Sequence, residues 1–159
     1  MNIHMIAVGR FSSSGPSQPE RQLFEDYQAR LAKSGFPLTL KEVEERRPIT
    51  GPDRARREGA LLLGAVPKGA VTVTLEPTGK VLSSEDLARW LGRSRDEGVR
   101  DLAFLIGGAD GLDGAVNEAA RLRLSLGAMT WPHMMVRPML AEQLYRAAAI
   151  LAGHPYHRG

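Results

Sequence analysis

The chain has 159 residues, of which 43% are hydrophobic and 25% are charged, and its formal net charge at neutral pH is +3. These values are typical of a globular protein with its own core, and they predict one domain over residues 1–159. The absence of cysteine excludes disulfides, a thiolate nucleophile and thiolate-bound metals. Because the N-terminus has no basic leader and no apolar run approaches about 18 residues, we expect a cytoplasmic protein without a membrane span.

The first part of the chain alternates between strand-like and helix-like segments. Residues 2–8 are short and apolar, which predicts a buried strand. A capping box of Ser17 and Glu20, after a Ser- and Pro-rich loop, predicts a helix that ends near Gly35. The alternating residues 36–45 (FPLTLKEVEE) then predict a strand near the edge of a sheet.

A basic stretch punctuated by proline and glycine follows, from Arg46 to Arg57. Its arginines are interleaved with four acidic residues: Glu44, Glu45, Asp53 and Glu58. The mixture predicts a surface patch that runs into a helix, and it assigns no function to these arginines.

The same alternation continues beyond this stretch. Residues 70–77 (AVTVTLEP) predict a strand, and a turn then leads to a helix that a capping box of Ser83 and Asp86 begins. Residues 102–108 (LAFLIGG) predict a buried strand, which a short helix within residues 109–123 follows.

The C-terminal part completes the pattern. Residues 124–131 (LSLGAMTW) predict another strand, Pro132 interrupts the chain, and a long helix is predicted from Pro138 to Ala152, with Pro138 in its first turn. Alternating helices and continuous apolar strands predict an α/β fold, with a mostly parallel sheet that helices cover on both faces.

Positive charge gathers in the last forty residues. Residues 120–159 hold five arginines and one acidic residue, and also three of the four histidines, His133, His154 and His157. This part of the chain is either a solvated basic face or a surface that meets an anionic partner. Since no carboxylate lies near these histidines in the sequence, we expect no metal site.

Ligands of open parallel sheets bind beyond the carboxyl ends of the strands, which here carry LEPTG (75–79), IGGADG (106–111) and LGAMTWPH (126–133). The glycine spacing matches neither the dinucleotide-binding pattern nor the phosphate-binding P-loop. Asp110 would also repel a phosphate. The glycines therefore either bring the backbone close to a neutral or cationic ligand, or form a tight turn with positive φ.

Five segments carry a resemblance to a known family: IHMIAVGR, VTLEPTGKVLSSEDLA, FLIGGADGL, LSLGAMTWPH and MVRPMLAEQLYRAAAILAGHPYHRG. Together they resemble the RlmH family of ribosomal RNA methyltransferases in the SPOUT superfamily, over nearly the whole chain. The resemblance implies methyl transfer from S-adenosylmethionine to N3 of a pseudouridine in 23S rRNA of assembled ribosomes. It also implies a homodimer and a C-terminal trefoil knot.

The resemblance further implies which residues form the site. The expected cofactor-binding residues are Leu75, Gly107, Gly108, Gly127, Ala128, Met129, Thr130, Trp131 and Pro132. The catalytic candidates are His133, Arg146, Tyr156, His157 and Arg158, with the tail acting on the partner subunit's site. Arg137 is expected to touch RNA phosphate or the partner subunit.

The residues themselves also allow other interpretations. Arg146 at i,i+4 from Glu142 is equally consistent with a structural ion pair, and Tyr156 with a frayed tail. A basic C-terminal part alone supports a ribosome- or RNA-binding protein without catalysis, and the alternation alone supports a flavodoxin-like nucleotide binder. Gly127 also departs from the serine or lysine expected in the family at that position.

Overall fold

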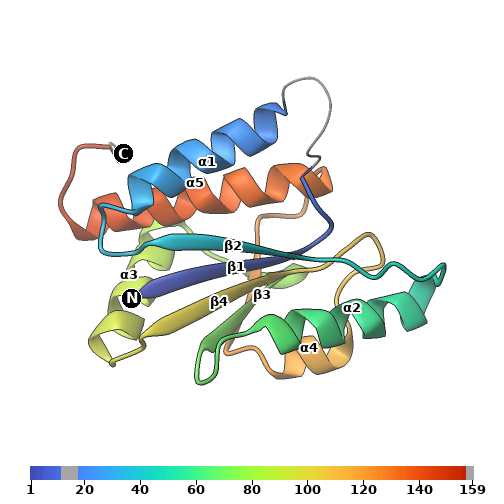
Figure 1. Cartoon of the computed structure of the whole chain (residues 1–159). Coiled ribbons are helices and arrows are strands. Elements are labelled where there is room, and N and C mark those ends of the chain that lie inside the picture. Colours follow the sequence, from blue (N-terminus) through green and yellow to red (C-terminus); the bar gives the residue numbers. More distant parts are fainter. Residues whose placement is uncertain (12–17, 157–159) are drawn as a thin grey trace.

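The computed structural model describes residues 1–11 and 18–156. Strands and helices alternate along it (Figure 1). The strands are β1 (Asn2–Val8), β2 (Leu38–Val43), β3 (Val71–Val81), β4 (Asp101–Ile106) and β5 (Leu122–Ser125). The helices are α1 (Pro19–Leu31), α2 (Gly51–Ala65), α3 (Ser84–Asp96), α4 (Gly114–Glu118) and α5 (His133–Leu151).

The strands form one sheet in the order β2-β1-β4-β3-β5, and every neighbouring pair is parallel. This confirms the predicted parallel α/β sheet and the edge position of β2. Parallel strands end at the same side of a sheet, so the loops that follow β1, β3, β4 and β5 all leave from that side.

Helices cover both faces of the sheet (Figure 1). Leu102, Phe104 and Ile106 of β4 point into a core with α1, α3 and α5, whereas Ala103 and Leu105 point to the opposite side, where α2 and α4 pack. This strict alternation of buried side chains is what a strand covered on both faces requires. No helix of residues 1–11 and 18–156 is long and apolar enough to cross a membrane.

Local sequence signals explain several helix starts. The side-chain oxygen of Ser83 accepts a hydrogen bond from the backbone N–H of Asp86, which confirms the predicted cap of α3. Asp113 caps α4 in the same way. The predicted start of α1 is one residue early, because Gln18 is the N-cap residue there and Ser17 lies outside the described residues.

Three predicted boundaries in the second half are wrong. β3 continues through the predicted turn to Val81, because its last residues pair with β5 after a register shift between Leu75 and Lys80. β5 ends at Ser125, so residues 126–132 form a loop instead of a strand. α5 begins at His133 and carries Pro138 inside it. Proline has no backbone N–H, and this matters little only in the first turn of a helix, where the N–H groups have no partner within the helix. At its interior position, Pro138 therefore removes one main-chain hydrogen bond.

Candidate functional site

A cavity of about 400 Å³ lies beyond the carboxyl ends of β4 and β5 and beside the middle of β3, where the register of that strand shifts. Its walls are mostly small and apolar, as is typical of sites for small organic ligands. Eight of the nine expected cofactor residues line it: Leu75, Gly107, Gly108, Gly127, Ala128, Met129, Thr130 and Trp131. Pro132 is the N-cap residue of α5 and does not line the cavity. We call this space the strand-end cavity.

The glycine loop, residues 107–111, forms one wall of the strand-end cavity. It folds back on itself, with the N–H of Gly111 donating to the carbonyl oxygen of Gly108 at 3.1 Å. Gly111 has φ +80°, a conformation that favours glycine. A Cβ atom on Gly107 would lie 2.9 Å from the carbonyl oxygen of Gly111. The loop's own packing therefore requires these glycines, before any ligand is considered.

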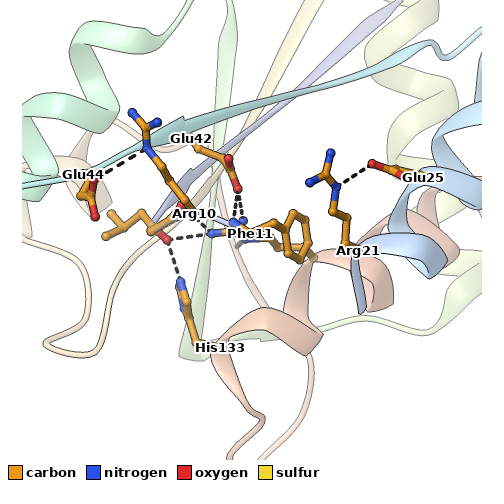
Figure 2. A network of polar contacts seen from close by, with 10 residues as sticks. Arg10, Phe11, Arg21, Glu25, Glu42, Glu44 and His133 are labelled. Carbon is orange, nitrogen blue, oxygen red and sulfur yellow. Dashed lines mark hydrogen bonds and ion pairs between the residues drawn. The ribbon is translucent and has the colours of Figure 1, made fainter. Parts of the chain in front are cut away.

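His133 also lines the strand-end cavity, at the first residue of α5. Its Nε2 atom lies 2.7 Å from the carbonyl oxygen of Val8, at the end of β1 (Figure 2). A carbonyl oxygen only accepts hydrogen bonds, so Nε2 carries a proton. In the neutral imidazole the lone pair is then on Nδ1, which makes Nδ1 the atom of His133 that is able to accept a proton.

Arg137 does not reach an exterior phosphate, contrary to the expectation from the sequence. Its side chain is fully buried, and Nη2 donates to the carbonyl oxygens of Val8 and Gly9, at 2.9 Å each. Nη1 donates to Glu42 at 2.6 Å, and the guanidinium lies 4.6 Å from the centre of the Phe11 ring. Burial lowers the pKa of Arg137, and the hydrogen bond to Glu42 opposes that shift.

A second group of functional candidates gathers where α5 meets α1. Glu142 accepts hydrogen bonds from Arg146 at 2.6 Å and from the hydroxyl of Tyr156 at 3.2 Å. The Tyr156 ring packs edge-on against Tyr145, and its hydroxyl lies 3.2 Å from that of Tyr27. We call these five residues the tail cluster. Burial, followed by the hydrogen bond to Tyr27, raises the pKa of Tyr156 above its usual value, so this hydroxyl stays protonated.

The strand-end cavity lies at the start of α5, whereas the tail cluster lies along the C-terminal half of this helix. His133 and Arg146 are thirteen residues apart on this helix, which corresponds to a rise of about 20 Å. α5 ends near the side of the sheet where β1 begins (Figure 1). Within one chain the structure thus places His133 beside the expected cofactor residues, and Arg146 and Tyr156 away from them. His157 and Arg158 lie outside the described residues.

Three of the four arginines within residues 120–156 form ion pairs with acidic side chains. Arg121 pairs with Glu97, Arg137 with Glu42, and Arg146 with Glu142, each at 2.6 Å. Two of these three acidic residues, Glu97 and Glu42, lie outside residues 120–159. A count of charges along the sequence therefore overestimates the positive charge of this part of the surface. No three His, Asp or Glu side chains of the described part of the chain are grouped as metal ligands.

Comparisons with known proteins agree with the resemblance seen in the sequence. The family model described as "Predicted SPOUT methyltransferase" matches residues 1–157. The chain is 55% identical to the "Ribosomal RNA large subunit methyltransferase H" of Rhodospirillum centenum and 51% identical to that of Paramagnetospirillum magneticum. Each alignment covers 99% of this chain and 99% of the relative.

Among solved structures, the chain is similar to the SpoU methyltransferase AviRb from Streptomyces viridochromogenes in complex with AdoMet. The TM-score is 0.44 at 12% sequence identity, over 96% of this chain and 61% of that chain. The family model and the full-length relatives confirm the resemblance by themselves: the chain belongs to the family of SPOUT methyltransferases, together with the large-subunit rRNA methyltransferases H.

Proposed function

We propose that this protein transfers a methyl group from S-adenosylmethionine to large-subunit ribosomal RNA in the cytoplasm, with N3 of a pseudouridine in the assembled ribosome as the acceptor. The observation that carries this proposal is the strand-end cavity, which eight of the nine residues expected from the family line. Full-length relatives at about half identity are named as methyltransferases of large-subunit ribosomal RNA.

The strand-end cavity fits the cofactor chemically. Leu75, Met129 and Trp131 offer apolar surface to a purine ring, and the small side chain of Ala128 lets a ligand approach the backbone at that position. No P-loop or dinucleotide pattern supplies a phosphate site, which suits a cofactor without phosphate. S-adenosylmethionine supplies an electrophilic methyl group on a positively charged sulfonium.

The chain's own residues have two tasks in such a reaction. The first is to hold the acceptor nitrogen in line with the methyl group, since positioning alone contributes several kcal/mol, up to about 10, to lowering a barrier. The second is to take the proton that N3 of the pseudouridine loses. Nδ1 of His133 is the candidate acceptor, because hydrogen bonding to Val8 leaves that nitrogen with the lone pair.

Two measurements on purified protein test this function. Calorimetry measures binding of S-adenosylmethionine, and single-turnover assays measure methyl transfer to ribosomes that lack the modification and to protein-free 23S rRNA. We expect cofactor binding and transfer to the ribosomes. Co-sedimentation with ribosomes without methyl transfer would favour the non-catalytic alternative, and failure to bind the cofactor would refute the proposal outright.

The working unit is a homodimer in which the tail of one subunit completes the site of the other. The support is the separation of about 20 Å along α5 between His133 and Arg146. Residues so far apart in one chain do not act together on one nucleotide. A second copy related by a two-fold axis allows the tail cluster of one subunit to approach the strand-end cavity of the other.

An apolar groove supports the same assembly. It lies between α1, the end of β3 and α5, and Leu23, Val81, Leu82, Pro138 and Met139 line it. Val81 is 67% exposed and Leu23 43%, which is high for large apolar side chains. Sedimentation of wild-type protein and of a Val81→Asp variant tests whether a second copy covers this groove. We expect a dimer that the variant weakens.

The trefoil knot belongs to the same proposal. After β5, at one edge of the sheet, the chain returns to α5, whose first residue contacts Val8 at the end of β1. The chain therefore passes the ends of β3 and β4, where the glycine loop also lies. Such a path is compatible with passage of the C-terminal segment through a loop of the chain, and an experimental backbone trace of the entire chain tests it.

A further inference from the structure

The glycine loop rests on α2, a helix that the expected site does not include. Glu58 of α2 is 2% exposed, and its Oε2 atom is buried without a hydrogen-bond partner among the described residues. A Cβ atom added to Gly108 would lie 2.6 Å from this oxygen and 3.0 Å from Cγ1 of Val8. The carboxylate of Glu58 therefore lies directly against the backbone of Gly108.

Arg54 joins Glu58 to the tip of the same loop. Its Nε atom donates to Oε1 of Glu58 at 2.9 Å and lies 3.9 Å from Oδ2 of Asp110. One guanidinium thus contacts a carboxylate beneath the loop and a carboxylate at its turn. Arg54 belongs to the basic stretch Arg46 to Arg57, to which no function was assigned from the sequence.

Neighbouring arginines of α2 do not share this position. Arg56 is exposed and pairs with Asp53 on its own helix at 3.3 Å, away from the loop. A buried carboxylate oxygen without a hydrogen-bond donor is costly to keep, by about 1–3 kcal/mol. Stability alone therefore does not explain the Arg54–Glu58 pair. Its contact with the wall of a binding site gives a reason for retaining it.

We propose that Arg54 and Glu58 are positioning residues that hold the glycine loop in its binding conformation and thereby set the affinity for the cofactor. Neither residue lines the strand-end cavity, so both act through Gly108 and Asp110. This inference rests on the proposed function for the identity of the ligand. The claim about the loop itself stands on the contacts alone.

The experiment compares Arg54→Met with Arg56→Met. Methionine and arginine have similar helix propensities, so both variants keep α2 intact and remove one guanidinium each. Calorimetry measures the affinity for S-adenosylmethionine and for the neutral product S-adenosylhomocysteine. Hydrogen exchange measures the protection of the amides of residues 107–112.

We expect Arg54→Met to weaken both ligands about fivefold to tenfold and Arg56→Met less than about twofold. KM for the cofactor should rise in Arg54→Met, while kcat at saturating cofactor stays the same, because the change affects ground-state and transition-state binding alike. The loop amides of Arg54→Met should exchange faster than those of wild type, without ligand present.

A steric test uses the contact between Glu58 and Gly108. Gly108→Ala should weaken cofactor binding, because its Cβ atom meets the carboxylate of Glu58. Adding Glu58→Ala to Gly108→Ala should cost less affinity than Glu58→Ala costs in wild type, since the clash disappears. Strict additivity of the two changes would contradict the proposed contact.

The outcomes separate this inference from the proposed function. If wild type does not bind S-adenosylmethionine, the proposed function fails, while amide exchange in Arg54→Met against Arg56→Met still tests the loop. If wild type binds but the two variants match in affinity and exchange, the inference is overturned. A loss confined to the cationic ligand would also overturn it, because that pattern indicates a charge effect in place of positioning.

Discussion

His133 and Arg137, one turn apart at the start of α5, donate to the same acceptor, the carbonyl oxygen of Val8. The two distances are 2.7 Å and 2.9 Å. The end of β1 is thereby fixed to α5 by one side chain that faces the strand-end cavity and one that is fully buried. The core thus orients a candidate catalytic residue directly.

Arg137→Lys should lower the free energy of unfolding by about 2–3 kcal/mol, measured by urea denaturation at neutral pH. Lysine keeps the charge but cannot donate to Val8, Gly9 and Glu42 together as the planar guanidinium does. The control is Arg121→Lys, whose surface pair with Glu97 is worth less than about 1 kcal/mol. Equal losses in the two variants would contradict the role assigned to Arg137.

The imidazole of His133 should be protonated at Nε2 in its neutral form. Two-bond ¹⁵N–¹H correlation spectra distinguish the two tautomers, and His133→Gln identifies the signals. Glutamine retains a donor for the carbonyl oxygen of Val8, so this variant should keep cofactor affinity and lose transfer by about a hundredfold. The opposite tautomer would exclude the hydrogen bond to Val8 as the structure has it.

Stability should depend on pH through Tyr156 with a defined sign. Burial and the hydrogen bond to Tyr27 raise the pKa of this hydroxyl, so the folded state binds its proton more tightly than the unfolded state does. The contribution is complete below the unfolded pKa of about 10 and is lost as the pH rises through the folded value. The urea midpoint of wild type should therefore fall toward that of Tyr156→Phe as the pH rises above about 10.

An advantage of wild type that grows over the same range would show that the phenolate is favoured in the folded state. That result would make Tyr156 a candidate base, contrary to its contact with Glu142.

Two glycine substitutions should have opposite effects on stability. A Cβ atom on Gly79 would lie 2.8 Å from the backbone of Arg123 and Leu124, so Gly79→Ala should separate β3 from β5 and cost about 1–3 kcal/mol. Gly64 lies in α2 with nothing within 4 Å of such an atom. Gly64→Ala should stabilise the protein by about 0.5 kcal/mol, through helix propensity. Thermal unfolding measures both, and a stabilised Gly79→Ala would contradict the observed pairing of β3 with β5.

Local patterns in the sequence were sufficient to predict the layered fold. Apolar runs marked the strands, the capping box marked Ser83, and alternation placed β2 at an edge, because each of these signals depends only on near neighbours. The start of α5 was predicted five residues late, because a proline usually marks a first turn and Pro138 does not. The far half of β3 was missed because pairing with β5 is a long-range contact.

The candidate site, like the fold, was predicted only in part from the sequence. Small residues after the strand ends predicted where a ligand would bind, because parallel strands end on one side, whereas the expected lining residues came from the family resemblance. Arg137 was misassigned, since nothing near it in the sequence shows that Glu42 and the end of β1 surround its guanidinium. Arg54 was hidden among exposed arginines for the same reason, and only the fold brings it to Asp110.

The central claim is an active site shared between two subunits, and mixed dimers test it most directly. One subunit ends after Gly153 and keeps its cavity, and the other keeps its tail but has the cavity filled by Ala128→Trp. Heterodimers isolated with two affinity tags are assayed for single-turnover methyl transfer to unmodified ribosomes. A tail acting across the interface restores one complete site of two, so we predict about half the wild-type rate per dimer. A rate no higher than that of the two parent homodimers would contradict the account.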